Sequence, residues 1–203
     1  MASSITALVW LVDSQAIDPD ALASYAAWLA QSERDRCARF VRPERRRQFI
    51  VGRALLRSAL GRLLDRAPET ILLHERAGLA PALPDVADVG FSISHSGRWV
   101  ACAAGRGVAL GLDIERSDPA RDVMALAEQA FDAQEVRALQ AQMPEARHAA
   151  FYRMWCAYEA RIKLARPSVA EYSLEAGGLA GVLACDRPLA QAPFLTPVRL
   201  HEL

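Results

Sequence analysis

The chain has 203 residues, of which 52% are hydrophobic and 24% are charged, a composition that excludes a disordered chain and a coiled coil. Lys and Arg together number 24, as do Asp and Glu, and the zero net charge disfavours a general nucleic-acid binder. The length suits one domain or two small ones that need no metal or disulfide staples.

The first half of the chain predicts a strand followed by helices. Residues 5–12 form an apolar run typical of a buried strand. Asp18 before Pro19 predicts a helix start, and helical segments continue to about residue 40. Pro43 opens a further helix with apolar residues at helical spacing. Residues 70–76 predict a strand and residues 78–88 a proline-containing loop.

The second half begins with a predicted β-hairpin over residues 90–104, followed by a strand over 108–115. Helices are expected at 119–131, 133–142 and 146–165, the second opening with a capping box of Asp132 and Glu135. The tail, 170–203, predicts short strands interrupted by Gly177 and Gly178. This order favours an α+β fold, with a division at the turn 105–107 into units 1–106 and 107–203.

No apolar run approaches the roughly 18 residues of a membrane span. Asp13 interrupts the apolar stretch near the N-terminus, and no basic segment precedes it, so we expect no signal peptide and a cytoplasmic location. The four cysteines, at 37, 102, 156 and 185, lack metal-clip spacing, and buried reduced thiols are expected.

A pair of carboxylates lies on the predicted strand Gly-Leu-Asp-Ile-Glu. Asp113 and Glu115 are two residues apart and therefore project from the same face, while Leu112 and Ile114 pack into the core. Adjacent carboxylates repel each other, and burial increases this cost. A hard divalent cation resolves the conflict, and Mg²⁺ commonly binds to one or two carboxylates plus phosphate oxygens. Two solvated acids on an edge strand are the alternative.

The predicted helix Trp-Cys-Ala-Tyr-Glu-Ala-Arg-Ile-Lys places Glu159 and Lys163 on one face beside an apolar stripe. Lys163 stands out because the other 23 basic residues are all arginine, and the two side chains differ chemically. An ordinary surface ion pair between Glu159 and Lys163 is the alternative, worth about 0.3–0.5 kcal/mol.

Two further clusters suit anion binding. In the hairpin, Ser94 and Ser96 are expected to face one way and His95 the other, so Ser94 and His95 do not form a nucleophile and base. The serine hydroxyls, the His95 ring and the N–H groups of the turn suit the binding of an anion. The alternative is a hairpin whose turn residues are simply polar. Seven arginines between residues 34 and 47 suit phosphate, or form a solvated helical face. Together the clusters suit an Mg²⁺-assisted reaction on a phosphorylated ligand.

The pattern resembles the 4′-phosphopantetheinyl transferases of the Sfp type. The matching segments are Phe-Ser-Ile-Ser-His-Ser-Gly-Arg-Trp-Val (91–100), Gly-Leu-Asp-Ile-Glu (111–115) and Trp-Cys-Ala-Tyr-Glu-Ala-Arg-Ile-Lys (155–163), with Cys-Ala-Arg-Phe (37–40) and Gly-Arg-Ala-Leu-Leu-Arg (52–57) upstream. The resemblance implies two similar α+β subdomains in a pseudo-dimer, with the active site between them. It implies transfer of the 4′-phosphopantetheine arm of coenzyme A to a serine of a carrier protein, releasing 3′,5′-ADP.

The resemblance also implies the roles of individual residues. Mg²⁺ would be held by Asp113, Glu115 and Glu159, and the pyrophosphate contacted by Lys163. Coenzyme A phosphate would be bound by Ser94, His95 and Arg36. Chemically, Glu159 is the candidate base for the carrier serine, and Lys163 would neutralise charge on the departing phosphate.

Two departures from the family pattern are visible. The segment Gly78-Leu79-Ala80-Pro81 lacks the basic residue usual there, and the chain ends where relatives continue into a further strand, so a trimmed second subdomain is expected. The expected partners are coenzyme A and an acyl-, polyketide- or peptidyl-carrier protein, and the expected state is a monomer. The alternatives are a non-catalytic relative that binds coenzyme A or a carrier, an Mg²⁺-dependent phosphohydrolase, and a structural domain.

Overall fold

The computed structural model describes residues 5–76 and 79–203. Its first sheet contains β1 (Ala7–Asp13), β4 (Val89–Ser96), β5 (Trp99–Arg106) and the short β9 (Thr196–Pro197), in the order β4-β5-β1-β9. The β4–β5 hairpin turns at Gly97, whose φ of 56° suits glycine. The strand predicted at 5–12 and the hairpin predicted at 90–104 are therefore confirmed, each within a few residues.

Three helices lie on the same side of the first sheet: α3 (Pro43–Leu64) packs on the sheet, and α1 (Pro19–Ala27) and α2 (Gln31–Ala38) pack on α3. Asp18 caps α1 as predicted, because its carboxylate accepts a 2.8 Å hydrogen bond from the Ala21 amide. The long α3 buries its apolar face against the outer side of the sheet, in a core that includes Leu55, Leu56 and Val100.

Between α3 and β4 the chain forms a short hairpin of β2 (His74–Arg76) and β3 (Leu79–Ala82). The strand predicted at 70–76 is thus limited to its last three residues. The loop predicted at 78–88 begins with β3 instead, and Gly78 itself lies outside the described residues. Arg76 closes this hairpin by donating to the Ala80 carbonyl at 2.8 Å.

The second sheet has three antiparallel strands in the order β6-β8-β7: β6 (Leu110–Arg116), β7 (Ala170–Ala176) and β8 (Leu179–Cys185). The tail thus begins with a hairpin of two seven-residue strands rather than several short ones. The helix α6 (Pro144–Leu164) covers the outer side of this sheet, and α4 (Val123–Ala130) and α5 (Ala133–Gln140) pack near its start. The capping box of Asp132 and Glu135 is confirmed.

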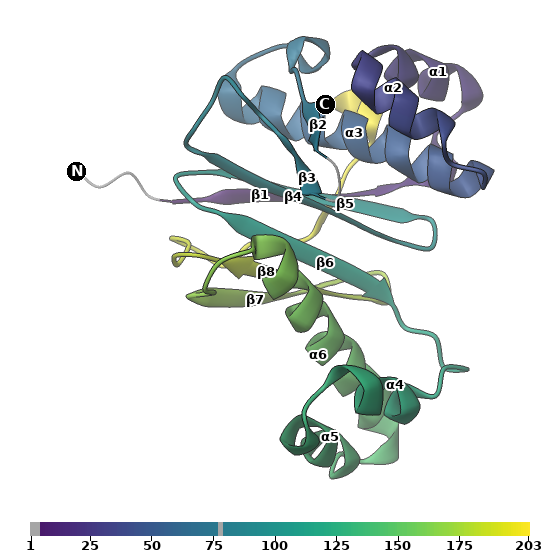
Figure 1. Ribbon diagram of the computed structural model, residues 1–203, viewed down its shortest axis with the longest axis vertical. Helices are drawn as coiled ribbons and strands as arrows, with labels where there is room; N and C mark the ends of the chain where they lie inside the picture. The colour runs from purple at the N-terminus through teal and green to yellow at the C-terminus, as the bar shows by residue number, and fades with distance from the viewer. Residues whose placement is uncertain (1–4, 77–78) are drawn as a thin grey trace.

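The two sheets face each other across a shared core, so that helices lie on the two outer sides (Figure 1). That core joins Leu11 and Ala103 of the first sheet to Leu112, Ile114 and Leu183 of the second. The mixed α+β class is confirmed. The C-terminal tail returns to the first half, where β9 pairs with β1 and Leu200 joins the core beneath α3. In the described ranges no helix is both long and apolar enough to cross a membrane.

Candidate active site

The candidate site lies where β4, β6 and α6 meet. Asp113 on β6 is buried, and its Oδ1 accepts hydrogen bonds from the Lys163 ammonium at 2.7 Å and the Ser94 hydroxyl at 2.8 Å. The same ammonium donates to Ser94 Oγ and to the Leu112 carbonyl, at 3.2 and 3.1 Å. All three protons of Lys163 are therefore engaged, and its ionic partner is Asp113 rather than Glu159.

Close approach of β6 and α6 makes this contact possible. A Cβ at Gly111 would lie only 2.0 Å from the Ala160 carbonyl oxygen and 2.5 Å from the Leu164 amide nitrogen. Gly111, Asp113 and Glu115 alternate along β6 and share the face that turns toward α6. The predicted common orientation of the two carboxylates is supported, and Leu112 and Ile114 lie in the core as expected.

Glu115 occupies the next position along that face. Its Oε2 accepts a 2.6 Å hydrogen bond from the Ser96 hydroxyl. Burial raises the pKa of this carboxyl, the hydrogen bond from Ser96 opposes the shift, and the nearby charge of Asp113 adds to it. A half-buried carboxylate beside the buried one of Asp113 is a group that a cation would stabilise.

Glu159 lies on α6 one turn before Lys163 and is half-buried. No hydrogen bond or ion pair to another described residue holds its carboxylate. Over residues 5–76 and 79–203, moreover, no three His, Cys, Asp or Glu side chains are gathered closely enough to hold a metal ion.

One observation nevertheless fits a cation. Asp113 Oδ2 is fully buried and has no hydrogen-bond partner, although Oδ1 has two. Most buried side-chain oxygens have a partner, so this unpartnered oxygen is available to a ligand. A hard divalent cation prefers such carboxylate oxygens, and the donor set of Asp113 and Glu115 is of the right chemical type.

His95 lies on the opposite face of β4 from Ser94 and Ser96, as predicted. Its Nδ1 is 3.2 Å from a guanidinium nitrogen of Arg45 on α3. Burial and the positive charges of Arg45 and Lys163 lower the pKa of His95, while Asp113 opposes the shift. His95 thus lies close enough to Asp113 and Lys163 for their charges to affect its pKa.

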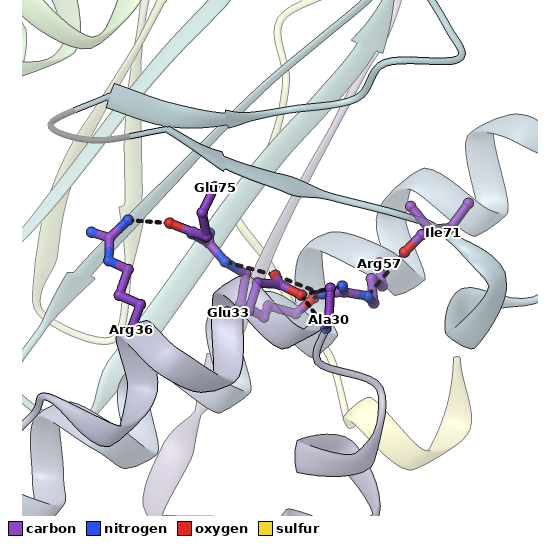
Figure 2. A network of polar contacts seen from close by, with 7 residues as sticks. Ala30, Glu33, Arg36, Arg57, Ile71 and Glu75 are labelled. Carbon is purple, nitrogen blue, oxygen red and sulfur yellow. Dashed lines mark hydrogen bonds and ion pairs between the residues drawn. The ribbon is translucent and has the colours of Figure 1, made fainter.

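Arg36, which the resemblance assigned to coenzyme A, is paired inside the protein. Its guanidinium lies 2.5 Å from Glu75 Oε2, and the other oxygen of Glu75 pairs with Arg53. Glu33 lies 3.1 Å from Arg53 and 2.5 Å from Arg57, so five charged side chains form one continuous network (Figure 2). Arg57 and Glu33 are entirely or almost entirely buried, whereas Arg36 lies at the exposed end.

The other arginines of the 34–47 stretch differ in environment. Arg47 donates to the carbonyls of Ser14 and Ile17 and ties α3 to the end of β1. Arg42 and Arg46 are exposed, as is Arg45.

All four cysteines are buried and free, as expected.

The sequence analysis grouped Ser96 and Arg45 with residues that suit an anion, but it did not predict that Ser96 contacts Glu115 or that Arg45 contacts His95. The alternation of serines at 92, 94 and 96 was the available signal, but it identifies a site only once the position of β6 is known. Ser94, which was assigned to phosphate, is buried, and its hydroxyl makes three hydrogen bonds within the protein: it donates to Asp113 and accepts from Lys163 and the Ile114 amide. Direct phosphate contact requires one of these to break.

Two family models match adjoining parts of the chain. Residues 18–107 match a model described as 4′-phosphopantetheinyl transferase, N-terminal, and residues 109–186 match the 4′-phosphopantetheinyl transferase superfamily. The two matches meet between β5 and β6, where the first sheet gives way to the second. The chain belongs to the 4′-phosphopantetheinyl transferase superfamily.

Similar curated proteins carry the same description. A 4′-phosphopantetheinyl transferase of Bacillus subtilis is 32% identical over 68% of this chain and 61% of its own length. The 4′-phosphopantetheinyl transferase HetI of Nostoc is 33% identical over 74% of this chain and 65% of its own length. A putative transferase of Synechocystis is 29% identical over 92% and 73%. The chain thus matches somewhat less than two thirds of the length of the first two relatives.

Proposed function

We propose that this protein transfers the 4′-phosphopantetheine arm of coenzyme A to a serine of an acyl-, polyketide- or peptidyl-carrier protein and releases 3′,5′-ADP. The observation that carries the proposal is the cluster of Asp113, Glu115 and Lys163 with an unpartnered buried oxygen, in a chain of this superfamily. The surrounding hydrogen bonds fix the cluster before any ligand arrives, as electrostatic catalysis requires.

The two-subdomain arrangement is part of the proposal. Each half has an antiparallel sheet with one long helix, α3 or α6, on its outer side, and β4 lies against β6 at the junction. This likeness supports a pseudo-dimer with units at 1–106 and 107–203, the last residues of the second unit reaching back to β1. The active site would lie at that junction.

We assign Mg²⁺ to Asp113 and Glu115, with Glu159 as a third candidate ligand from α6. When bound, the ion would polarise the phosphate and neutralise charge on the leaving group. The free Oδ2 of Asp113 supports this assignment, as does the raised pKa of Glu115.

The proposed transfer is a displacement at phosphorus that is assisted by Glu159 and Lys163. The carrier serine oxygen bonds to the β-phosphorus of coenzyme A while the bond from that phosphorus to the bridging oxygen breaks, and 3′,5′-ADP leaves with the electron pair. Glu159, which is not engaged elsewhere, takes the serine proton directly or through water. Lys163 holds Asp113 in place and brings its positive charge to the departing phosphate.

Phosphate binding is assigned to the β4 side of the junction. Arg45 donates to Nδ1 of His95 there, which leaves the other Arg45 N–H groups and the Nε2–H group of His95 for a phosphate. Arg36 is the exposed end of the charged network. We also assign Ser94 to phosphate binding, although its present hydrogen bonds hold Asp113 and Lys163 in position. We further propose that the protein is a monomer and is located in the cytoplasm.

Incubation with coenzyme A, Mg²⁺ and a panel of apo-carrier proteins tests the function, with intact mass as the readout. We expect one carrier or more to gain the mass of a single phosphopantetheine. Glu159→Gln should lower the rate by about 10²–10⁴-fold, the usual contribution of a general base, without loss of helical circular dichroism. A panel that stays unmodified while the protein binds coenzyme A would favour a non-catalytic relative.

A further inference from the structure

The face of β4 that meets β6 carries only small residues. Positions 90, 92, 94 and 96 alternate along the strand, so they share one face, and they are Gly, Ser, Ser and Ser. A Cβ at Gly90 would lie 2.0 Å from the Val108 carbonyl oxygen. The start of β4 therefore lies close to the backbone of the segment that leads into β6, and the two strands are in contact although they belong to different sheets.

The three serine hydroxyls connect these strands at regular intervals. Amides of β6 donate to hydroxyls of β4 from Leu112 to Ser92 at 2.9 Å, from Ile114 to Ser94 at 3.2 Å and from Arg116 to Ser96 at 3.0 Å. The offset is 20 residues each time, so the strands run parallel in fixed register. Each hydroxyl takes the place that a backbone carbonyl has in a continuous sheet.

Each serine oxygen accepts an N–H group from an amide of β6, so the single proton of that hydroxyl is free to point toward another acceptor. Ser94 donates to Asp113 at 2.8 Å, and Ser96 donates to Glu115 at 2.6 Å. In both cases the carboxylate belongs to the residue immediately before the donating amide. Ser92 makes the same amide contact, but the corresponding residue is Gly111, so it has no carboxylate to orient.

We propose that Ser96 is a positioning residue, which orients Glu115 for the divalent cation by linking its Oε2 to the Arg116 amide. This inference rests on the proposed function and extends it to a residue outside the charged cluster. Glu has three rotatable side-chain bonds, and the hydrogen bond to Ser96 removes much of that freedom before the cation arrives. Ser94 does the same for Asp113, but it also contacts Lys163, so its variants are harder to interpret.

Mn²⁺ binding to the full chain in the presence of coenzyme A, followed by the electron paramagnetic resonance of free Mn²⁺, tests the proposal. We expect Ser96→Ala to raise the dissociation constant about 10- to 100-fold, as loss of a residue supporting a metal ligand usually does. Ser92→Ala is the matched control, since it loses one interstrand amide contact and no carboxylate contact. Its affinity should stay within about twofold of wild type.

Two further measurements separate positioning from general damage. Urea unfolding should show similar losses of stability in Ser96→Ala and Ser92→Ala, and Ser96→Thr should recover Mn²⁺ affinity because it keeps a hydroxyl. In the transfer assay, Ser96→Ala should need more Mg²⁺ for half-activation yet approach the wild-type kcat when Mg²⁺ is saturating.

Equal Mn²⁺ affinity in Ser96→Ala and wild type would overturn the inference while leaving the transferase proposal intact. So would an equal loss of affinity in Ser92→Ala. Wild type that binds Mn²⁺ without modifying any carrier would overturn the proposed function alone, and wild type that binds no Mn²⁺ would overturn the cation site and this inference together.

Discussion

At the scale of single residues, the site depends on Asp113, whose two oxygens have different roles. Oδ1 receives Lys163 and Ser94, and Oδ2 has no partner. Asp113→Asn keeps an acceptor for the two donors but removes the charge. We expect it to lower the transfer rate at least about 100-fold while the protein stays folded, measured by intact mass and circular dichroism. A rate within about twofold of wild type would refute the cation assignment.

Glu115 provides a prediction about pH. Its pKa is raised in the folded protein, chiefly by burial, so the folded state binds more protons than the unfolded chain as pH rises past the ordinary value of 4.5. Stability from this group is complete below that value and is lost as pH rises through the folded pKa. In EDTA at neutral pH, Glu115→Gln should therefore have a higher free energy of unfolding than wild type, and the difference should vanish in acid.

Urea unfolding across this pH range makes the comparison, and Glu175→Gln on the exposed side of β7 controls for the change in net charge. A Glu115→Gln protein that is less stable than wild type at neutral pH would show that the carboxylate is already compensated by groups of the chain itself.

Residues of the site were only partly predictable from the sequence. Alternation along a strand correctly placed Asp113 and Glu115 together and His95 opposite Ser94, because that rule is local. The partners of Lys163 and Arg36 were not predictable, since Asp113 and Glu75 lie 50 and 39 residues away along the chain. The alternative that paired Lys163 with the nearby Glu159 is not found, because the approach of β6 to α6 brings Asp113 to the Lys163 ammonium.

At the scale of elements, the contact between β6 and α6 has no room for a side chain at position 111. Gly111→Ala would place a Cβ 2.0 Å from a backbone oxygen of α6, which must move the helix and with it Lys163. We expect a loss of about 1–3 kcal/mol or more in urea unfolding, with transfer lost as well.

Gly52 within α3 is the control for this substitution. A Cβ there would meet Ile93 and Val100 side chains at an ordinary 3.5 Å. Gly52→Ala should be neutral or stabilise by up to about 1 kcal/mol through helix propensity. If the two variants lost equal stability, close packing of β6 on α6 would not be the cause.

The buried network couples α2, α3 and β2. Glu33 is fully buried between Arg53 and Arg57, so Glu33→Gln leaves two buried cations short of a charge (Figure 2). We expect a loss of about 3–5 kcal/mol in the free energy of unfolding. Glu202→Gln, which removes the exposed pair with Arg199, should cost at most about 1 kcal/mol. A small effect at Glu33 would mean that solvent reaches the network.

At the scale of the whole molecule, the starts of α1, α3 and α5, the β4–β5 hairpin and the α+β class followed from local patterns such as Asp18-Pro19. The helix predicted from residue 119 begins only at Val123, because Asp122 rather than Asp118 caps it. The return of β9 to β1 was not predictable, because two paired residues carry no periodic signal. Nor was the packing of the two sheets, which depends on residues from both halves such as Leu11 and Leu183. The serine contacts between β4 and β6 show how that packing and the site arise together.

The most direct test of the account is the amount of 3′,5′-ADP released from coenzyme A with and without an apo-carrier protein, measured by chromatography beside the intact mass of the carrier. We predict release only when the carrier is present, in an amount equal to the carrier modified, and loss of both signals in Asp113→Asn. Release without a carrier would identify a phosphohydrolase and contradict the account, as would the absence of release with every carrier tested.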